Sequence, residues 1–593
     1  MPYPYFFCSR TSASATVFLL ALLPGFSTAA EPSEAASPMS MYFDDSQMVE
    51  VATRAPKPMR QVAENVSIVT AEEIADMHVH TLLEVLERQP GISVAYNGAD
   101  YGSSGNFYLQ GTEWRHTLVL IDGVRINNAS AGEALINFVP LPIIKRIEII
   151  KGPASSVWGS SLGGVVNIIT KDTGTTAVPK ASAMVTYGEA ASRELNADLA
   201  GAAGVVSYYL NAGSLDSNGL KNNRFHDRET VYGKMAIKLP QQMTLSAAAG
   251  YSDPYYKTGD FYSLDVSDTI RNRNFWGTVY FDAPIRDSLS LHLEAQRFDM
   301  RYFQENTKIG QSTYAGWAGG LLQSNDYKEQ TTAFNGRLFW DGDMVDMTVG
   351  AESSRGQLDY TYIYDYSGVG PWVGSEFAPT AYEERRAVYS NATITLGKFA
   401  VTPGLRYDYH SIAGEFISPS LGATYQLTDD TLLRGTVARG FSAPALALIS
   451  GGNAFTPVNP MLKPELIDSV QAGVETFRIP GLQLKANLFH HDVTDVWTAT
   501  VPRENEGRTR YKGVDLSAKT LPWHDLTLTA NGTYAITDSA TQENDDLYST
   551  SLVLDYNERQ SLKAQLAGRY IWFNDRETID GGGTPRIWNT HFI

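Results

Sequence analysis

The chain has 593 residues, 32 of them tyrosine and 50 glycine, with 65 acidic against 47 basic side chains. This length suffices for a large core or for several domains. The net charge of −18 argues against the basic face on which nucleic-acid binding depends, so we expect no nucleic-acid partner. The single cysteine, Cys8, lies near the start of the chain.

Residues 1–30 have the pattern of a secretory signal peptide. They contain no acidic residue, one arginine and an apolar run from Val17 to Leu23, and they end in small residues up to Ala30. The alternative is a short membrane anchor, but the run is shorter than the roughly 20 residues that a spanning helix needs. Removal of this segment leaves no cysteine, and no later run suits a transmembrane helix. Such an exported chain is either soluble or a membrane β-barrel.

Residues 31–47 are acidic and rich in proline, serine and alanine, which predicts a flexible tail. Within residues 48–54 an extended, apolar-leaning pentad follows, formed by Met48, Val49, Glu50, Val51 and Ala52. A solitary strand buries nothing by itself, but it can add to the sheet edge of another protein. We therefore predict a partner-binding strand here. An ordinary edge strand of the following domain is the alternative.

Residues 55–175 are expected to form a small α+β domain. Residues 66–70 favour a strand, and Thr70 with Glu73 makes a capping box that starts a helix. Thr81 can cap a second, apolar helix. Residues 118–121 predict a further strand that ends in a tight turn.

The segment 145–171 is the compact end of this domain. β-Branched residues favour a strand at its beginning and again at residues 165–170, and the glycines between them allow turns or close backbone approach. No apolar helix follows, which argues for close packing against a wall rather than phosphate binding. The positions expected to shape the domain are Asp122, Gly123, Gly152, Pro153, Gly159, Gly163, Gly164 and Asn167.

The chain offers little for bond chemistry. His78 and His80 are one residue apart, but on a helix this spacing places them on different faces, which favours two solvated side chains over a metal site. No nucleophile, base or metal cluster stands at a useful spacing. We expect no enzyme activity, no catalytic residues, no metal and no cofactor.

After residue 174 the pattern changes to a strict alternation, which indicates long antiparallel strands. In residues 288–296 apolar side chains at odd positions alternate with polar ones at even positions, and residues 482–488 repeat the alternation. Apolar-out, polar-in stretches of about ten residues are typical of transmembrane β-barrels. We predict that residues 176–593 form such a barrel, with a soluble sandwich as the alternative.

Short and long connections alternate between these strands, as periplasmic turns and extracellular loops do in outer-membrane barrels. The short links are expected at residues 240–242, 341–343, 397–399, 428–430 and 522–525. The long links are expected at residues 216–230, 253–273, 304–325, 359–382 and 443–463. Soluble β folds have no reason to separate loop lengths in this way.

Counting from residue 181, we find nineteen complete strands and the start of a twentieth at residues 586–593. A closed bacterial barrel has an even number of strands, and the plugged transporters have about 22. The prediction is a mainly β fold, a transmembrane antiparallel barrel of this 22-strand type with an N-terminal α+β plug. About 20 strands are present, so we expect the barrel to be incomplete at its C-terminal end.

Five motifs together resemble the TonB-dependent outer-membrane receptors, a family in which a plug domain sits inside the barrel. They are LLEVLERQPGISV at residues 82–94, LVLIDGVRIN at 118–127, KRIEIIKGPASSVWGSSLGGVVNIIT at 145–170, ARGFSAPAL at 438–446 and NPMLKPE at 459–465. The resemblance covers most of the chain after the signal peptide.

The resemblance implies a mechanical function. Residues 48–54 match the TonB box, which pairs as a strand with the TonB protein of the inner membrane. In the family, ExbB and ExbD drive TonB with the proton-motive force, and TonB pulls on the plug to open a path. The resemblance also implies a monomeric barrel in the outer membrane of a Gram-negative bacterium.

Two positions depart from the family pattern. Gln110 stands before Gly111 where arginine is common, which predicts that a neutral contact replaces one ion pair between plug and barrel. Trp158 stands where tyrosine is usual.

Aromatic residues in two long connections are the candidate ligand contacts, since flat amphipathic rings suit a large ligand. They are Tyr255, Tyr256 and Tyr262 in one connection and Tyr360, Tyr362, Tyr364 and Trp372 in the other. An aromatic girdle with loop packing is the alternative interpretation.

Haem receptors of this family tend to carry a histidine between the two barrel motifs, and residues 445–458 contain none. The resemblance therefore favours a ferric siderophore or cobalamin as the transported ligand, with a haem or metal receptor of the same family as an alternative. A passive porin or adhesin and a secreted enzyme are the alternatives from other classes. The plug motifs argue against the first, and the lack of a catalytic cluster argues against the second.

Overall fold

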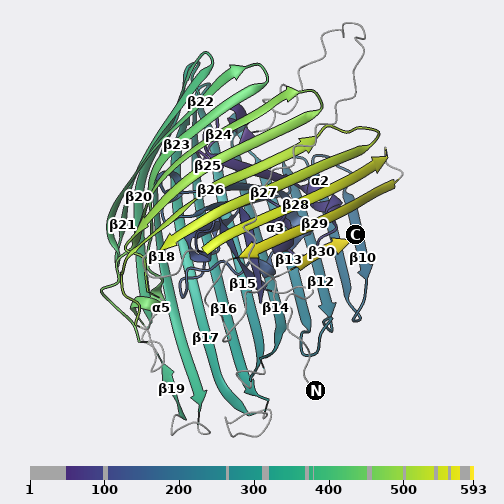
Figure 1. Cartoon of the computed structure of the whole chain (residues 1–593), viewed down its shortest axis with the longest axis vertical. Coiled ribbons are helices and arrows are strands. Elements are labelled where there is room, and N and C mark those ends of the chain that lie inside the picture. The colour runs from purple at the N-terminus through teal and green to yellow at the C-terminus, as the bar shows by residue number, and fades with distance from the viewer. Residues whose placement is uncertain are drawn as a thin grey trace, which may run out of the picture.

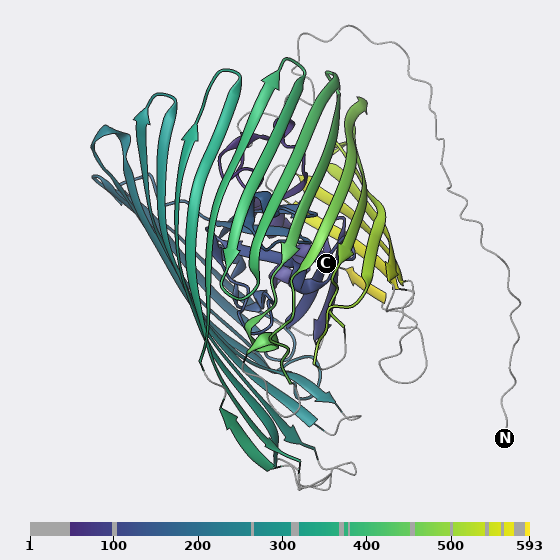
Figure 2. The same ribbon diagram turned by 90° about the vertical axis from the view of Figure 1, so that its left-hand side faces the viewer.

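The computed structural model describes residues 48–97, 104–261, 266–309, 320–366, 373–377, 380–450, 457–498, 502–539, 545–558, 562–573 and 588–592. One large antiparallel sheet curls around a smaller N-terminal domain (Figures 1 and 2). No described helix is both long and apolar enough to cross a membrane. The predicted signal peptide and flexible tail lie outside the described residues.

The strands of the large sheet follow the order of the chain. They are β10 (Lys180–Tyr187), β11 (Arg193–Ala203), β12 (Val206–Ser217), β13 (His226–Lys238), β14 (Thr244–Phe261), β15 (Val266–Arg286), β16 (Leu289–Lys308), β17 (Leu321–Trp340), β18 (Val345–Asp365), β19 (Val373–Phe377), β20 (Ala381–Leu396), β21 (Phe399–His410), β22 (Gly414–Thr428), β23 (Thr431–Ser442), β24 (Glu465–Ile479), β25 (Leu482–Thr494), β26 (Arg508–Thr520), β27 (Leu526–Ser539), β28 (Asp545–Glu558), β29 (Leu562–Phe573) and β30 (Trp588–Phe592).

Among the described residues this sheet has 21 strands, of which β19 pairs only with the C-terminal end of β18. Because β18 also pairs directly with β20, the wall proper has 21 minus 1, or twenty, strands. The predicted nineteen strands and a short twentieth are confirmed, since β30 spans five residues. Within the described part of the chain, β10 pairs only with β11 and β30 only with β29.

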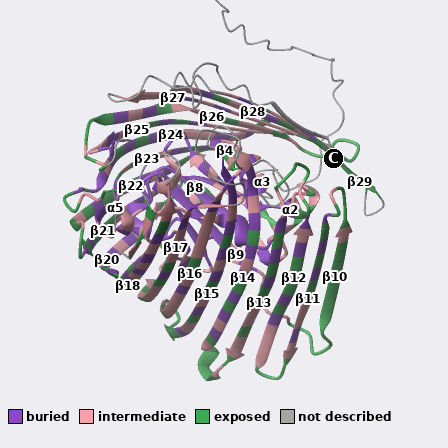
Figure 3. Ribbon diagram, turned by 90° about the horizontal axis from the view of Figure 1, so that it is seen from below, coloured by how far each residue is buried: buried purple, intermediate pink, exposed green. Residues whose placement is uncertain are grey.

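The alternation in the sequence sorts side chains between the two faces of the sheet. On β16, Leu293 is 46% exposed on the outer face, whereas Glu294 points towards the N-terminal domain and lines a cavity there. On β13, Val231 is 59% exposed and the adjacent Tyr232 is 1% exposed. Buried residues gather around the N-terminal domain in Figure 3. An apolar outer face and a polar inner face are the arrangement that the sequence predicts.

Several connections that the sequence predicts to be long are continuations of strands. The predicted loop 253–273 is mostly a hairpin, because β14 and β15 stay paired up to the contact of Phe261 with Val266. Pairing satisfies the backbone polar groups of this stretch, whose aspartates and glycine suggested a loop. Links 240–242 and 397–399 are short, as predicted.

The N-terminal domain is an α+β plug that lies inside the curved sheet (Figure 2). Its elements are β1 (Met48–Val49), β2 (Lys57–Pro58), η1 (Met59–Gln61), β3 (Asn65–Thr70), α2 (Ala71–Asp76), α3 (Leu82–Glu87), β4 (Ile92–Asn97), β5 (Ser104–Leu109), η2 (Trp114–His116), β6 (Thr117–Ile121), β7 (Val124–Arg125), η3 (Ile136–Phe138), η4 (Leu141–Ile143), β8 (Ile144–Lys151), α4 (Ser155–Trp158) and β9 (Gly164–Thr170). The wall adds η5 (Pro240–Gln242) and α5 (Leu446–Ile449).

The plug has a five-stranded sheet in the order β3–β8–β9–β6–β7, in which β6 and β9 run parallel. The predicted capping box between Thr70 and Glu73 starts α2, and Thr81 caps α3. Asp122 adopts a positive φ of 45° at the turn between β6 and β7. The predicted α+β character of this domain is therefore confirmed.

Aromatic residues of the wall complete the core of the plug. Phe138 of η3 lies with its ring centroid 5.4 Å from that of Trp276 and 6.4 Å from that of Phe298. Trp276 also stacks on Tyr232 at 6.4 Å. This cluster joins β13, β15 and β16 to the plug and fixes its position against one side of the wall.

Replacing Gly250 with alanine should weaken this cluster. Gly250 pairs with Trp276 across the ladder, and a Cβ atom there would lie 2.1 Å from Cζ2 of the indole. Overpacking of this kind costs about 1–3 kcal/mol, so the heat-induced gel-shift midpoint of the protein should fall. Gly568→Ala is the control, because its Cβ would enter open space. Equal midpoints for both variants would contradict the expectation.

Candidate functional site

The predicted partner-binding segment is buried between the plug and the wall. Met48 and Val49 pair with Pro58 and Lys57 as a short hairpin, and the side chain of Val51 is fully buried. After Val49 the backbone turns, with the amide of Arg54 donating to the carbonyl of Glu50 at 2.8 Å. The segment therefore folds back on the plug within a few residues.

Side chains of the compact segment 145–171 hold this turn. The carboxylate of Glu148 on β8 accepts hydrogen bonds from the amides of Glu50 at 3.0 Å and Val51 at 2.9 Å. The indole N–H of Trp158 donates to the carbonyl of Val51 at 2.7 Å. Burial raises the pKa of Glu148, and the guanidinium of Arg146, 2.7 Å away, opposes this rise. The backbone of Val51 is thus bound by side chains rather than by another strand.

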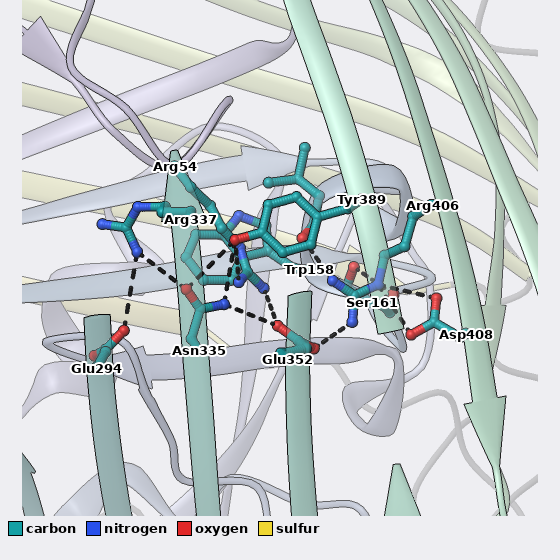
Figure 4. A network of polar contacts seen from close by, with 12 residues as sticks. Arg54, Trp158, Ser161, Glu294, Asn335, Arg337, Glu352, Tyr389, Arg406 and Asp408 are labelled. Atoms are coloured by element: carbon teal, nitrogen blue, oxygen red, sulfur yellow. Dashed lines mark hydrogen bonds and ion pairs between the residues drawn. The ribbon is translucent and has the colours of Figure 1, made fainter. Parts of the chain in front are cut away.

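Arg54 connects the segment to the wall (Figure 4). Its Nη2 atom lies 2.8 Å from Oε2 of Glu352, and Nη1 donates to the hydroxyl of Tyr389 at 3.2 Å. The guanidinium lies 4.1 Å from the ring centroid of Trp158 and 4.6 Å from that of Tyr389. Arg406 also donates to Glu352. One carboxylate therefore joins two buried arginines.

Further contacts join the segment to β20 and β21. Asn391 donates to the carbonyl of Thr53 at 3.2 Å, and the ammonium of Lys57 donates to the hydroxyl of Thr402 at 2.8 Å. Burial lowers the pKa of Lys57 to about 8, against the opposing charges of Glu64 and Asp346. These contacts belong to one docked state of the segment.

The expectation of an extended strand in a mobile tail is wrong for the structure of Met48 to Ala52. The pentad is a two-residue strand followed by a turn, and the alternative, an edge strand attached to the plug, describes it better. The reason is local: Val49, Val51 and Ala52 find an apolar pocket, and Glu148 and Trp158 supply the hydrogen bonds that a partner strand would otherwise offer. The role of these residues in partner binding stays a prediction.

A second set of contacts fixes the plug on the side of β24 to β26. Gln110 donates to Asp515 at 2.8 Å and lies 2.8 Å from Nε2 of His491. This hydrogen bond stands where the sequence predicts loss of an ion pair. Arg115 and His116 instead meet the buried carboxylate of Glu465, at 2.8 and 2.7 Å.

Most of the positions predicted to shape the plug lie where other atoms approach its backbone closely. A Cβ atom on Gly152 would lie 2.1 Å from Nε2 of Gln471 in the wall, and one on Gly164 would lie 2.2 Å from the carbonyl oxygen of Ile150. Asp122 accepts from the amide of Thr170 at 2.9 Å and so ties the turn to β9. Close approaches to other side chains also occur at Gly123, Gly159 and Gly163. Pro153 lines a small space beside the wall, and Asn167 lines a larger cavity between the plug and the wall.

Three of the predicted aromatic ligand contacts form one row on β18. The ring centroids of Tyr360 and Tyr362 are 6.4 Å apart, and those of Tyr362 and Tyr364 are 5.5 Å apart. Sequence reasoning missed Tyr327 on β17, which stacks on Tyr360 at 4.5 Å, and Tyr302 on β16, which lies 6.2 Å from Tyr327. Cross-strand register was the missing signal, since these two face each other directly.

The other predicted contacts do not join this row. Tyr255 is exposed on the outer side, where its ring lies 5.0 Å from Phe225, whereas Tyr256 is buried inside and lies 5.6 Å from the ring of His226. Neighbouring residues of a strand face opposite ways. Tyr262 and Trp372 lie outside the described residues.

The tip of the plug lies next to the aromatic row. The amides of Ala129 and Ser130 donate to the carboxylate of Glu329 on β17, the second at 3.0 Å. The amide of Leu446 at the start of α5 donates to the carbonyl of Ala129 at 2.7 Å. Leu446 and Ile449 of α5 belong to one apolar cluster with Leu358, and Tyr327 packs against this cluster. The plug tip, the wall and α5 thus enclose one side of the aromatic row.

His78 and His80 do not assemble a metal centre. His78 contacts the carbonyl of Asp76, and His80 lies 3.9 Å from Glu194. Among the residues that the structure describes, no group of three or more histidine, cysteine, aspartate or glutamate side chains could hold a metal ion.

Comparison with known families matches both parts of the chain. The profile described as "TonB dependent receptor-like, beta-barrel" matches residues 207–590, and the profile described as "TonB-dependent Receptor Plug Domain" matches residues 58–165. The vitamin B12 transporter BtuB of Vibrio vulnificus strain CMCP6 is 25% identical over 436 residues, which cover 72% of this chain and 67% of the relative. The vitamin B12 transporter BtuB of Photobacterium profundum is 27% identical, with 70% of this chain and 65% of the relative covered.

Solved structures share the fold. A mutant of the ferric enterobactin receptor PfeA from Pseudomonas aeruginosa has a TM-score of 0.69 at 20% identity and covers 89% of each chain. The siderophore receptor PirA from Acinetobacter baumannii has a TM-score of 0.66 at 19% identity and covers 86% of each chain.

Removing the guanidinium of Arg54 should release the N-terminal segment. Loss of one partner of a largely buried pair costs several kcal/mol. Arg54→Ala should therefore shift the equilibrium between the docked and the released segment towards the released state by about tenfold or more. A spin label on Met48→Cys, a unique thiol once the predicted signal peptide with Cys8 is removed, should become more mobile. Arg439→Ala, which breaks an exposed pair with Asp468, is the matched control. Unchanged mobility in Arg54→Ala would contradict the expectation.

Docking of the segment should strengthen as pH rises. Lys57 has a pKa of about 8 when docked and 10.5 as its ordinary value. Between these values the released segment binds the proton that the docked segment lacks, so each pH unit favours docking by up to about tenfold. The same spin label reports the change. Lys57→Met should remove the dependence, and its persistence in that variant would refute the assignment.

Proposed function

The chain belongs to the TonB-dependent receptor family, and we propose that it imports a scarce, large nutrient across the outer membrane, with TonB supplying the energy. Members of this family are receptors and transporters rather than enzymes, so the work is conformational and no bond chemistry is involved. The observation that carries the proposal is the docked N-terminal segment, because its backbone is held by contacts that a partner strand can replace.

The exchange of contacts centres on Val51. Its amide and carbonyl are both satisfied by side chains, those of Glu148 and Trp158. A strand of TonB that adds to residues 48–54 offers the same two kinds of group from its own backbone. Pairing can then proceed with little loss of hydrogen bonds, provided that the segment first leaves its pocket.

Withdrawal of the segment acts on the plug and on the wall. The hydrogen bonds that Glu148 accepts from the amides of Glu50 and Val51 transmit a pull to β8, which lies between β3 and β9 in the plug sheet. The ion pair between Arg54 and Glu352 transmits the same pull to β18. TonB, energised by ExbB and ExbD, is the source of the force, and a single chain in the outer membrane is the unit that responds.

The transported ligand is a ferric siderophore or cobalamin. The relatives named for vitamin B12 transport and the structures named as ferric enterobactin and siderophore receptors support both candidates. The row from Tyr302 through Tyr327 to Tyr364 places aromatic rings next to the plug tip, with Tyr360 and Tyr362 buried within it. Aromatic rings at the accessible ends of this row suit ligands of this size.

Deletion of residues 48–52 should abolish accumulation of ligand while leaving cell-surface binding intact. The loss follows because TonB no longer has a strand to pair with, whereas the aromatic row stays in place. Cells that lack their own receptors would be given labelled cobalamin and a panel of labelled ferric siderophores, which also identifies the ligand. Deletion of residues 35–39, five residues of the predicted tail, is the control of equal length. Normal accumulation without residues 48–52 would sink the proposal.

A further inference from the structure

A cavity of about 480 Å³ lies between the plug and one side of the wall. It extends from Ala129 at the plug tip to Lys145 and Asp172 near the base of the plug sheet. Its outer wall comes from strands between β13 and β20, and Arg54 of the docked segment forms part of its inner wall. The cavity therefore passes the tip, the middle and the docked segment of the plug.

Equal numbers of cationic and acidic residues line this cavity, but they do not all pair with one another. The lining cations are Arg54, Arg125, Lys145, Arg146, Lys234, Arg337 and Arg385, and the lining acids are Glu50, Asp122, Asp172, Asp282, Glu294, Glu352 and Glu383. Each acid contacts a cationic or histidine partner, and Asp282 takes His292 at 2.6 Å. Because Asp282 pairs with a histidine rather than with a lining cation, one lining arginine has no lining acid as its partner.

The arginine without a partner is Arg125 on β7. Within the described residues, no hydrogen bond or ion pair engages its side chain, whereas the other six lining cations each lie within 4.0 Å of a carboxylate oxygen. Its acidic neighbours are already engaged: Glu383 meets Arg385 at 2.8 Å and His410 at 3.3 Å. Glu352 likewise meets Arg54 and Arg406.

The surroundings of Arg125 favour an added negative charge. Burial lowers the pKa of Arg125 to about 9, and the positive charge of Arg385 acts in the same direction. Arg125 is only partly buried and lines the cavity, so an anion that enters the cavity can meet its planar fork and offset the cost of holding this cation away from bulk water. Oxyanions with two oxygens in one plane match this fork best.

We propose that Arg125 is an oxyanion-binding site inside the cavity and that it receives a negatively charged group of the transported ligand after the ligand leaves the outer binding surface. The matching chemistry is a phosphate diester, a carboxylate or a deprotonated catecholate. The step in transport rests on the proposed function. Arg54 and Glu50 line the same cavity, so withdrawal of the docked segment widens the space next to Arg125.

The site itself is tested without transport. A cysteine in place of Ser354, which lines the cavity and pairs with Arg385 across the ladder, is the unique thiol of the full chain once Cys8 is removed with the predicted signal peptide. Two methanethiosulfonate reagents of similar size, one carrying a sulfonate and the other a trimethylammonium group, would be reacted with it in outer membranes. We expect the ratio of anionic to cationic rates to fall about tenfold or more in Arg125→Gln.

Two further variants separate the possible causes. Arg125→Lys keeps the charge and should keep the ratio near that of the parent, and Lys145→Gln removes a lining cation that already pairs with Asp172. A ratio that is the same in Arg125→Gln and in the parent overturns the proposal. A fall of equal size in Lys145→Gln also overturns it, because general cavity charge would then explain the result.

The transport step is tested with the same substitutions in the otherwise native chain. Arg125→Gln should reduce accumulation of a labelled ferric catecholate or of labelled cobalamin by about tenfold and leave surface binding unchanged, with Arg125→Lys closer to the parent. Loss with the catecholate alone or with cobalamin alone identifies the oxyanion as catecholate or phosphate diester. A changed thiol ratio with unchanged uptake refutes the transit step and leaves the uptake function standing.

Discussion

The ion pair between Arg54 and Glu352 is the contact on which the rest of the site depends. It joins the N-terminal segment to the wall, and it places the guanidinium between Trp158 of the plug and Tyr389 of β20. Three parts of the molecule that are far apart in the chain therefore share one buried charge. While the segment is docked, the amide and the carbonyl of Val51 are bound by Glu148 and Trp158. In the proposed function, the segment that pairs with TonB is masked in this way.

The unpaired charge in the cavity complements this ion pair. The acids near the middle of the cavity are committed to Arg54, Arg385 and Arg406, and among the residues that the structure describes Arg125 has no carboxylate in an ion pair with it. In the proposed site, the residues that dock the segment leave this cation available to a ligand. Withdrawal of the segment, as proposed, would change both the width of the cavity and its electrostatics through the same set of ion pairs.

Local patterns in the sequence predicted the local structure well. The alternation of leucines with polar residues in 288–296 predicted the two faces of β16, and Thr70 with Glu73 predicted the start of α2. The sequence alone could not show which distant residues contact one another in the fold. The burial of Val51 depends on Glu148 and Trp158, and the aromatic row depends on the register that places Tyr302 opposite Tyr327. The composition of residues 253–273 predicted a loop, but most of this stretch forms paired strands in spite of its loop-forming residues.

The central claim is that the docked segment must leave its pocket for transport. The most direct measurement ties it down with a disulfide between Thr53→Cys and Asn391→Cys, at the place where the side chain of Asn391 donates to the main-chain carbonyl of Thr53 at 3.2 Å. Cells carrying this variant would be assayed for ligand binding and accumulation before and after mild reduction. We predict normal binding throughout, no accumulation while the bond is intact, and recovery on reduction. Accumulation with the tether in place would contradict the claim.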